Sequence, residues 1–427
     1  MSNGTAFGLR AAKVLDDAGA FTGPVDVLVQ DGAVVSLRGA VPEGVQAMDA
    51  SGLWLMPGIV DCHVHLGSFF DESLEKMMST SITRWTTEAL RNARELLAMG
   101  ITLGRDPGSC DAGIRDGIGD GAVPGPTLKV SGTALSQTGG HTDGYIPSLG
   151  AEAYGGFLVP DHLNRGPYRV DGVEAMRRAI RELLRLDVDW IKLCTTGGLL
   201  STGRDHPLRQ EFSREEVEVA LEEAGRAGIP TCAHAYGGPG LDIAVESGAR
   251  SIEHGLHITE EQAAKRAEAG CWLVPTLVVV DQLAELAAAG ELSPYVAEKV
   301  REVQELSGRQ VQIARAAGVR IAVGSDLIGQ GRNLAELPLL AAAGMPAGEV
   351  LLSATQGGAE LLGLGDTHGR IAPGFVFDAI LLDRDPSNLE LFREAGAVSA
   401  VFQGGAAVLP HARWRAQGLP LPEVTIG

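Results

Sequence analysis

PGIVDCHVHL, residues 57–66, is the stretch that decides the fold. Its short apolar run is typical of a buried strand, and the run ends in the tripeptide His-Val-His. From there to about residue 365, strand-like runs alternate with amphipathic helical segments. Eight strand candidates occur, at residues 58–65, 100–106, 127–133, 188–194, 229–235, 249–254, 271–276 and 319–326. Eight such βα units have the size of a TIM barrel, so we expect an α/β (β/α)8 fold for residues 57–365.

A doubly wound sheet is the alternative fold for this region. Its Gly-rich dinucleotide fingerprint is missing, because the first strand continues as HVHLGS. The most distinct helix, residues 213–227, begins at an N-cap serine with a capping-box Glu216 and is followed by Gly228. Outside the barrel region, residues 25–37 and 371–383 read as strands around turns.

Composition excludes several classes of function. The chain has 427 residues with 35 basic and 54 acidic side chains, for a formal charge of −19. A surface with this much negative charge repels phosphate backbones and anionic lipid. We therefore expect no nucleic-acid or membrane partner. The sequence has no apolar run of about 18 residues and no secretory signal pattern. The five scattered cysteines indicate reduced thiols, and we expect a cytoplasmic protein.

Ligand-type and charged residues gather at the ends of the predicted strands, where a parallel barrel places its chemistry. They are His63, His65, Lys192, His234, His254 and Asp326. The first two histidines are two residues apart, so both imidazoles face the same side of a strand. Two hydrogen-bonded rim histidines would explain that tripeptide alone. The joint placement of four histidines and an aspartate favours a divalent metal site.

Lys192 is unusual at such a site, because an ammonium group cannot ligate a metal. It is a counter-ion to Asp326, a Schiff-base nucleophile, or a lysine modified into an acceptor. Asp326 follows Gly-Ser, and its carboxylate can hold a metal and accept a proton from water. As a simple turn or N-cap residue, Asp326 would have neither role.

Four further residues are candidates for contact with a substrate. His141 lies in the Gly-rich loop TGGHTDGY, which is either a shaped binding loop or a flexible surface loop. Tyr236 shares the face of His234 if that strand continues, and is otherwise a packing residue. Arg204 and His206 lie in a long loop near the expected mouth, where a basic side chain either holds a substrate carboxylate or is solvated.

Together these segments resemble the amidohydrolase superfamily of metal-dependent hydrolases. The matching segments, in order, are PGIVDCHVHL, WIKLCTTGG, CAHAYG, SIEHG and VGSDL. SQTGGHTD, the TTGG turn and the tyrosine of HAYG are most similar to prolidase-like peptidases of the imidazolonepropionase-related group. The chain departs from the common pattern in having GSD rather than GTD, and PGFVFDAILL in its tail. Neither departure removes a ligand.

The resemblance implies a role for each candidate. His63, His65 and Asp326 would hold the more buried of two divalent ions, and His234 and His254 the more exposed one. Lys192 would be carboxylated and would bridge the ions. Zinc is the expected metal, with manganese, cobalt or iron as alternatives. His141 would polarise the scissile carbonyl, and Tyr236 would help to hold the substrate. Residues 1–56 and 366–427 would form a small composite β-sandwich domain beside the catalytic barrel.

The expected function is hydrolysis of an amide bond in a small molecule, by attack of a metal-bridging hydroxide. A dipeptidase, carboxypeptidase or N-acyl-amino-acid type of substrate is expected, and carbamates, ureas and aryl-amide xenobiotics are the alternative. Asp326 takes the proton and passes it to the leaving amine, with His141 and Lys192 as the other catalytic residues. A Schiff-base lyase using Lys192 and a non-catalytic binding barrel remain open. We also expect a homo-oligomer.

Overall fold

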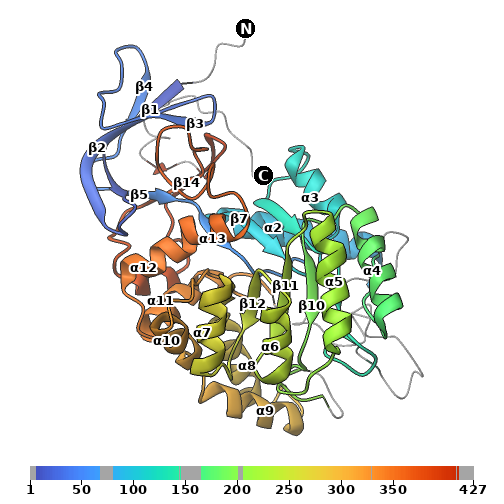
Figure 1. Cartoon of the computed structure of the whole chain (residues 1–427). Helices are drawn as coiled ribbons and strands as arrows, with labels where there is room; N and C mark the ends of the chain where they lie inside the picture. The colour runs from blue at the N-terminus through green and yellow to red at the C-terminus, as the bar shows by residue number, and fades with distance from the viewer. Residues whose placement is uncertain are drawn as a thin grey trace.

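The two ends of the chain meet in one eight-stranded sheet. The computed structural model describes residues 6–67, 80–143, 145, 165–200, 205–327, 329–409 and 411–412. The strands of this sheet are β1 (Ala6–Leu15), β2 (Phe21–Gln30), β3 (Ala33–Leu37), β4 (Gln46–Asp49), β5 (Trp54–Pro57), β14 (Ala379–Leu382), β15 (Ala400–Gln403) and β16 (Ala406–Leu409). Their order is β16-β15-β14-β5-β1-β2-β3, with β4 beside β1. Figure 1 shows β14, from the red end of the chain, among the blue N-terminal strands.

Local chemistry explains the hairpin between β2 and β3. Asp31 and Gly32 both have positive φ, at 52° and 80°. An Asp-Gly pair with two positive φ values is the turn that matches the twist of paired strands. The turn predicted from the Gln-Asp-Gly sequence is therefore present.

The strands that lie between β5 and β14 in the sequence are parallel to one another and form two further sheets. One contains β6 (Ile59–Asp61), β7 (Ile101–Asp106) and β8 (Thr127–Val130). The other contains β9 (Ala134–Leu135), β10 (Ile191–Cys194), β11 (Thr231–Ala235), β12 (Ser251–His254) and β13 (Trp272–Val274). The parallel α/β organisation predicted from the sequence is present.

The eighth strand candidate lies between these two sheets. Ile321 forms a parallel bridge to Leu273 of β13, and the Val323 carbonyl accepts a hydrogen bond from the Cys62 amide at 2.8 Å. On the opposite flank, the Asp189 amide donates to the Val130 carbonyl at 2.8 Å. Residues 319–323 therefore connect β13 to the β6 side of the other sheet.

Helices follow most of the parallel strands and surround them (Figure 1). They are α2 (Ile82–Ala98), α3 (Ala112–Gly119), α4 (Val173–Arg185), α5 (Arg214–Arg226), α6 (Gly238–Glu246), α7 (Glu260–Ala269), α8 (Leu277–Ala289), α9 (Pro294–Gln304), α10 (Arg309–Ala316), α11 (Glu336–Ala342), α12 (Ala347–Leu352) and α13 (Gly358–Leu361), with short turns at Asn333–Ala335, Ser353–Gly357 and Leu389–Arg393. The predicted capping box of Ser213 and Glu216 starts α5. None of the helices in the described part of the chain combines the length and apolar character of a membrane span.

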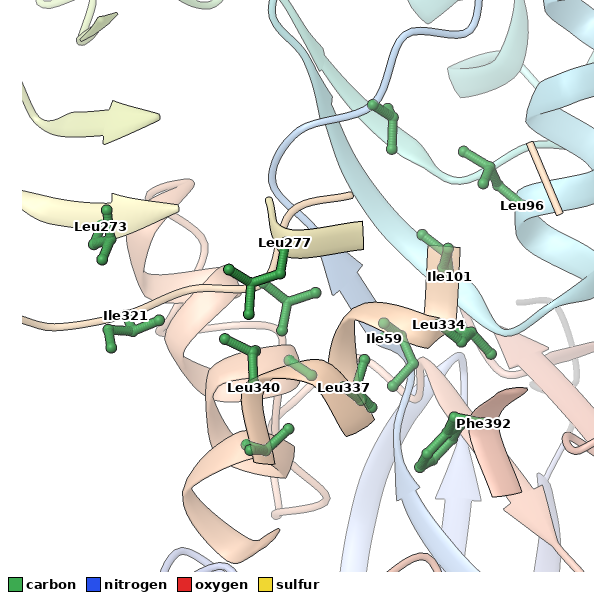
Figure 2. Packing of buried hydrophobic residues seen from close by; sticks show 14 of the residues in the cluster. Ile59, Leu96, Ile101, Leu273, Leu277, Ile321, Leu334, Leu337, Leu340 and Phe392 are labelled. Carbon is green, nitrogen blue, oxygen red and sulfur yellow. The ribbon is translucent and has the colours of Figure 1, made fainter. Parts of the chain in front are cut away.

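The largest hydrophobic cluster packs the helices onto the parallel strands and reaches the C-terminal segment. Figure 2 shows Ile59 and Ile101 of neighbouring strands close to Leu334 and Phe392. Buried side chains of the eight-stranded sheet form a second cluster, which includes Leu55 and Leu381. The first of these clusters includes Ile59, Ala233 and Ile252 of the strands that carry the candidate site.

Candidate metal centre

Three predicted ligands converge where β6 and the eighth strand candidate end: His63 and His65 follow β6, and Asp326 is the last residue of the candidate. His63 Nε2 lies 3.3 Å and His65 Nε2 lies 3.1 Å from the same oxygen of Asp326, Oδ1. The ligand atoms of this group all lie within 4.8 Å of one another. The sequence predicted His63 and His65 inside a strand, but β6 ends at Asp61 and both histidines follow it. Three donors of these types at this spacing suit a divalent ion.

Asp61 ties together the two segments that carry these ligands. Its Oδ1 accepts hydrogen bonds from the amides of His63 at 3.1 Å and Ser325 at 3.0 Å. Its Oδ2 accepts the Ser325 hydroxyl at 2.6 Å. The serine that replaces the commoner threonine thus uses its hydroxyl group to connect the segments. Asp326 itself has a positive φ of 52°, and its amide donates to the His63 carbonyl at 2.7 Å.

His234 and His254 lie beside this group. Their ring centroids are 4.6 Å apart, and the ring of His254 is 5.4 Å from that of His63. His234 Nε2 lies 3.0 Å from the Gly197 carbonyl, and His254 Nδ1 lies 2.7 Å from Thr276 Oγ1. Each imidazole therefore has one nitrogen held by the protein, and among the described residues the other nitrogen forms no hydrogen bond and is available to an ion.

Burial keeps these imidazoles in the neutral form that binds metals. Burial, together with the charge of Lys192, lowers the pKa of His63 to about 4. Burial lowers the pKa of His254 to about 3 and that of His234 well below its usual value. Burial alone would raise the pKa of Asp326, but the neighbouring imidazoles of His63 and His65 outweigh it and hold this pKa well below its usual range. At neutral pH the Asp326 carboxylate therefore lies near the neutral imidazoles of His63, His234 and His254, and carboxylates and neutral imidazoles are the donors of divalent metal sites.

Lys192 is buried on β10, in register with Cys232 of β11. Its charge lowers the pKa of His63, His234 and His254, so its ammonium lies within electrostatic reach of the cluster. Within the described ranges, Lys192 forms no hydrogen bond or ion pair. The direct ion pair with Asp326 that the sequence left open is therefore not formed among those residues.

His141 reaches the cluster from the loop after β9. Its ring stacks on that of His234, with centroids 4.1 Å apart, and its buried Nδ1 has no hydrogen-bond partner in the described part of the chain. The His141 amide donates to Glu211 Oε1 at 2.5 Å. A Cβ added to Gly198 would lie 1.9 Å from His141 Nδ1, so the absence of a side chain at residue 198 makes room for the imidazole.

The remaining substrate candidates differ in their placement. Tyr236 lies 4.9 Å from His234 and 5.2 Å from His254 between ring centroids, so it borders the cluster. His206 is exposed, and its Nδ1 accepts a hydrogen bond from the Leu208 amide at 3.2 Å. No described contact joins His206 to the metal-site histidines. Arg204 lies outside the described residues.

Sequence reasoning missed the buried charges next to the ligands. Arg105 and Glu253 form an ion pair of 2.8 Å, and Glu253 Oε2 lies 2.7 Å from His63 Nδ1. Glu211 supports the His141 loop. The available signal was a charged residue inside each of the strand runs ITLGRD and SIEH, where a parallel strand is expected to be apolar.

Comparisons with known proteins show the family of the chain. Residues 54–408 match the model of the amidohydrolase family. The chain is 34% identical to ochratoxinase of Aspergillus niger over 365 residues, which cover 82% of this chain and 75% of that protein. It is 28% identical to imidazolonepropionase of Salinispora tropica over 396 residues, covering 87% of this chain and 88% of that protein.

A solved structure supports the same assignment. A prolidase complexed with N-methylphosphonate-L-proline is similar with a TM-score of 0.87 and 31% identity, over 95% of this chain and all of that one. The resemblance to prolidase-like and imidazolonepropionase-related amidohydrolases is therefore confirmed. The chain belongs to the amidohydrolase family and is a hydrolase that acts on carbon–nitrogen bonds.

Proposed function

We propose that this protein is a metal-dependent amidohydrolase that cleaves the amide bond of a dipeptide or an N-acyl amino acid. The observation that carries the proposal is the convergence of His63, His65 and Asp326, with His234 and His254 beside them. These residues would hold two divalent ions, for which zinc suits the ligand types. Lys192, once carboxylated, would supply the acceptor that an ammonium lacks.

We propose that the parallel strands close into a (β/α)8 barrel formed by residues 57–365. Three connections support closure: the bridge between Leu273 and Ile321, and the backbone hydrogen bonds of the Cys62 and Asp189 amides. Residues 1–56 and 366–427 would form the composite β-sandwich domain. The shared sheet of β1–β5 and β14–β16 supports that division.

The chemistry divides between the metal and the residues of the chain. Bound divalent ions lower the pKa of water and polarise a carbonyl oxygen. Asp326 is a carboxylate at neutral pH and can accept a proton and return it to a leaving amine. His141 is neutral because burial lowers its pKa to about 4, so it can donate a hydrogen bond to a carbonyl oxygen without carrying a charge. Tyr236, whose ring lies 4.9 Å from that of His234, can also contact the bound substrate.

One solved relative favours an amide next to an amino acid. It is the prolidase bound to an analogue that contains L-proline, and it is 31% identical to this chain. This relative supports an amino-acid amide over the carbamates, ureas and aryl-amides that form the alternative substrate class. Ochratoxinase, at 34% identity, supports hydrolysis of a carbon–nitrogen bond without deciding between these substrates.

A metal-dependence screen tests the proposal. Elemental analysis of dialysed protein is expected to find about two divalent ions per chain. Zinc-loaded protein should hydrolyse members of a panel of dipeptides and N-acyl amino acids, lose the activity with a chelator, and regain it with metal. Cys232→Ala is the control, because it removes a buried neighbour of Lys192 that is not a proposed ligand. Protein without bound metal would contradict the proposal, and preferential hydrolysis of carbamates or ureas would contradict the substrate class.

A further inference from the structure

A fully buried ion pair lies directly against a metal ligand. Arg105 of β7 and Glu253 of β12 both have 0% exposed side chains, and Arg105 Nη2 lies 2.8 Å from Glu253 Oε2. The other two nitrogens of Arg105 also donate: Nε donates to the Cys62 carbonyl at 2.7 Å, and Nη1 donates to Ser251 Oγ at 3.0 Å. The guanidinium lies 4.5 Å from the ring of Trp190. Arg105 is therefore held in one orientation from several sides.

Glu253 transmits that fixed position to His63. One carboxylate oxygen, Oε1, accepts the Ser251 hydroxyl at 2.6 Å. The other, Oε2, receives Arg105 and also lies 2.7 Å from His63 Nδ1. Because the Arg105 guanidinium and the Ser251 hydroxyl both donate to Glu253, this carboxylate is paired with a cation and acts as the acceptor at both oxygens. His63 Nδ1 must therefore carry the proton.

The opposite nitrogen of His63 then has a lone pair. His63 Nε2 faces Asp326 Oδ1 at 3.3 Å, so an imidazole lone pair meets a carboxylate oxygen. Two acceptors at that distance repel one another unless a cation lies within reach of both. The fixed tautomer thus prepares Nε2 for a metal ion.

Stability alone does not account for these buried charges. Removing a guanidinium and a carboxylate from water is costly, and apolar residues of similar volume often stabilise a protein equally well. Arg105 and Glu253 lie among apolar interior residues such as Trp190, where an apolar pair would be expected. Glu253 contacts His63, and Arg105 contacts Glu253.

We propose that Arg105 and Glu253 are positioning residues that lock His63 as the Nδ1–H tautomer and present its Nε2 to the metal. The inference rests on the proposed function, because it assumes that His63 binds an ion. Carboxylate partners of this type raise the basicity of a histidine ligand and fix its ring. Arg105 acts through Glu253, because it keeps this carboxylate ionised and in place.

Two variants separate positioning from stability. Glu253→Gln preserves the shape, but its amide can donate as well as accept, so the tautomer is no longer fixed; Arg105 is also left without its counter-ion. The double variant Arg105→Met/Glu253→Gln removes both charges and should recover thermal stability relative to Glu253→Gln. Asp378→Asn is the matched control: its buried carboxylate accepts the Gly404 amide at 2.7 Å and contacts no proposed ligand.

The measurement is binding of Co²⁺, followed by its visible absorption spectrum and by competition with a chelator. Both Glu253 variants are expected to bind Co²⁺ about 10- to 100-fold more weakly, with an altered spectrum, and Asp378→Asn should match the wild type. Wild-type affinity and spectrum in the double variant would overturn the inference while leaving the proposed function intact. If the wild type binds no Co²⁺, the proposed function fails, and the inference fails with it.

Discussion

Glu211 is the residue whose environment makes the clearest prediction about pH. Its Oε2 accepts the Ser136 hydroxyl at 2.6 Å, and its Oε1 accepts the amide of His141. Burial raises the pKa of Glu211 to about 8, from 4.5 in an unfolded chain. The folded protein therefore retains a proton that the unfolded chain has lost between these two pH values. The stability contributed by this group is complete below pH 4.5 and is lost as pH rises through 8.

Glu211→Gln should remove that pH dependence. The glutamine resembles the protonated carboxyl group, so the variant and the wild type should have similar melting temperatures at about pH 5. At about pH 9 the wild type should melt lower than the variant, because its ionised carboxylate is buried. Calorimetry at the two pH values checks this. Parallel changes in both proteins would show that Glu211 does not hold a proton in the fold.

Asp326→Asn tests the acid–base role of the last ligand. Asparagine retains an oxygen for the metal but cannot accept a proton. Turnover should fall by roughly 10²- to 10⁴-fold, the usual contribution of a positioned acid–base group. Metal content should change much less, because the histidines remain. Turnover, bound metal and melting temperature are measured together on this variant; a wild-type rate with both ions bound would exclude Asp326 as the base.

Contacts between two loops make a prediction at the scale of elements. The loop after β10 passes against the His141 loop, and Gly198 leaves the space that His141 fills. Gly198→Ala should displace the imidazole and lower turnover at least tenfold, while the metal content stays unchanged. Gly117→Ala in α3 is the control, because a Cβ there meets no atom within 4 Å. It should leave activity unchanged and stabilise the helix by about 0.5–1 kcal/mol. Equal activities of the two variants would contradict the role of Gly198.

Local sequence signals predicted which helices and strands form better than they predicted the residues at which these elements begin and end. The capping box of α5 and the Asp-Gly hairpin depend on neighbouring residues, and both are present. The segment predicted as one helix over 297–317 is divided into α9 and α10, with Gly308 at a φ of 88° between them. β6 is shorter than predicted because the Asp61 carboxylate binds the amides of His63 and Ser325. That contact joins residues far apart in the sequence, which no local pattern reveals.

The residues of the candidate site also divide into those that the sequence could predict and those that it could not. The ligands could be predicted because each one ends an apolar run and a common rim brings such ends together. The pairing of Arg105 with Glu253 could not, because it depends on which strands face one another across the interior and at what height. The hydrogen bond from the His141 amide to Glu211 depends on the conformations of two loops, and the sequence of a loop does not define its conformation.

At the scale of the whole molecule, the shared sheet should govern stability. Leu381 of β14 pairs with Leu55 of β5, and both are fully buried. Leu381→Ala should lower the free energy of unfolding by about 2–5 kcal/mol. Val35→Ala, at a side chain with 48% exposure in the same sheet, should change it by less than about 0.5 kcal/mol. Denaturant titration compares the two variants, and equal midpoints would show that the pairing contributes little.

The pairing of β5 with β14 also has a consequence for biosynthesis. The N-terminal strands leave the ribosome first, whereas β14 to β16 emerge after the sequence of every parallel strand. Until then, the edge of β5 that pairs with β14 has unpaired backbone groups, and Leu381 does not yet lie beside Leu55. Open apolar edges associate with other chains. During most of its translation the nascent protein therefore exposes a strand edge that can associate with other chains. Premature termination before β14 would release a chain in which this edge stays exposed.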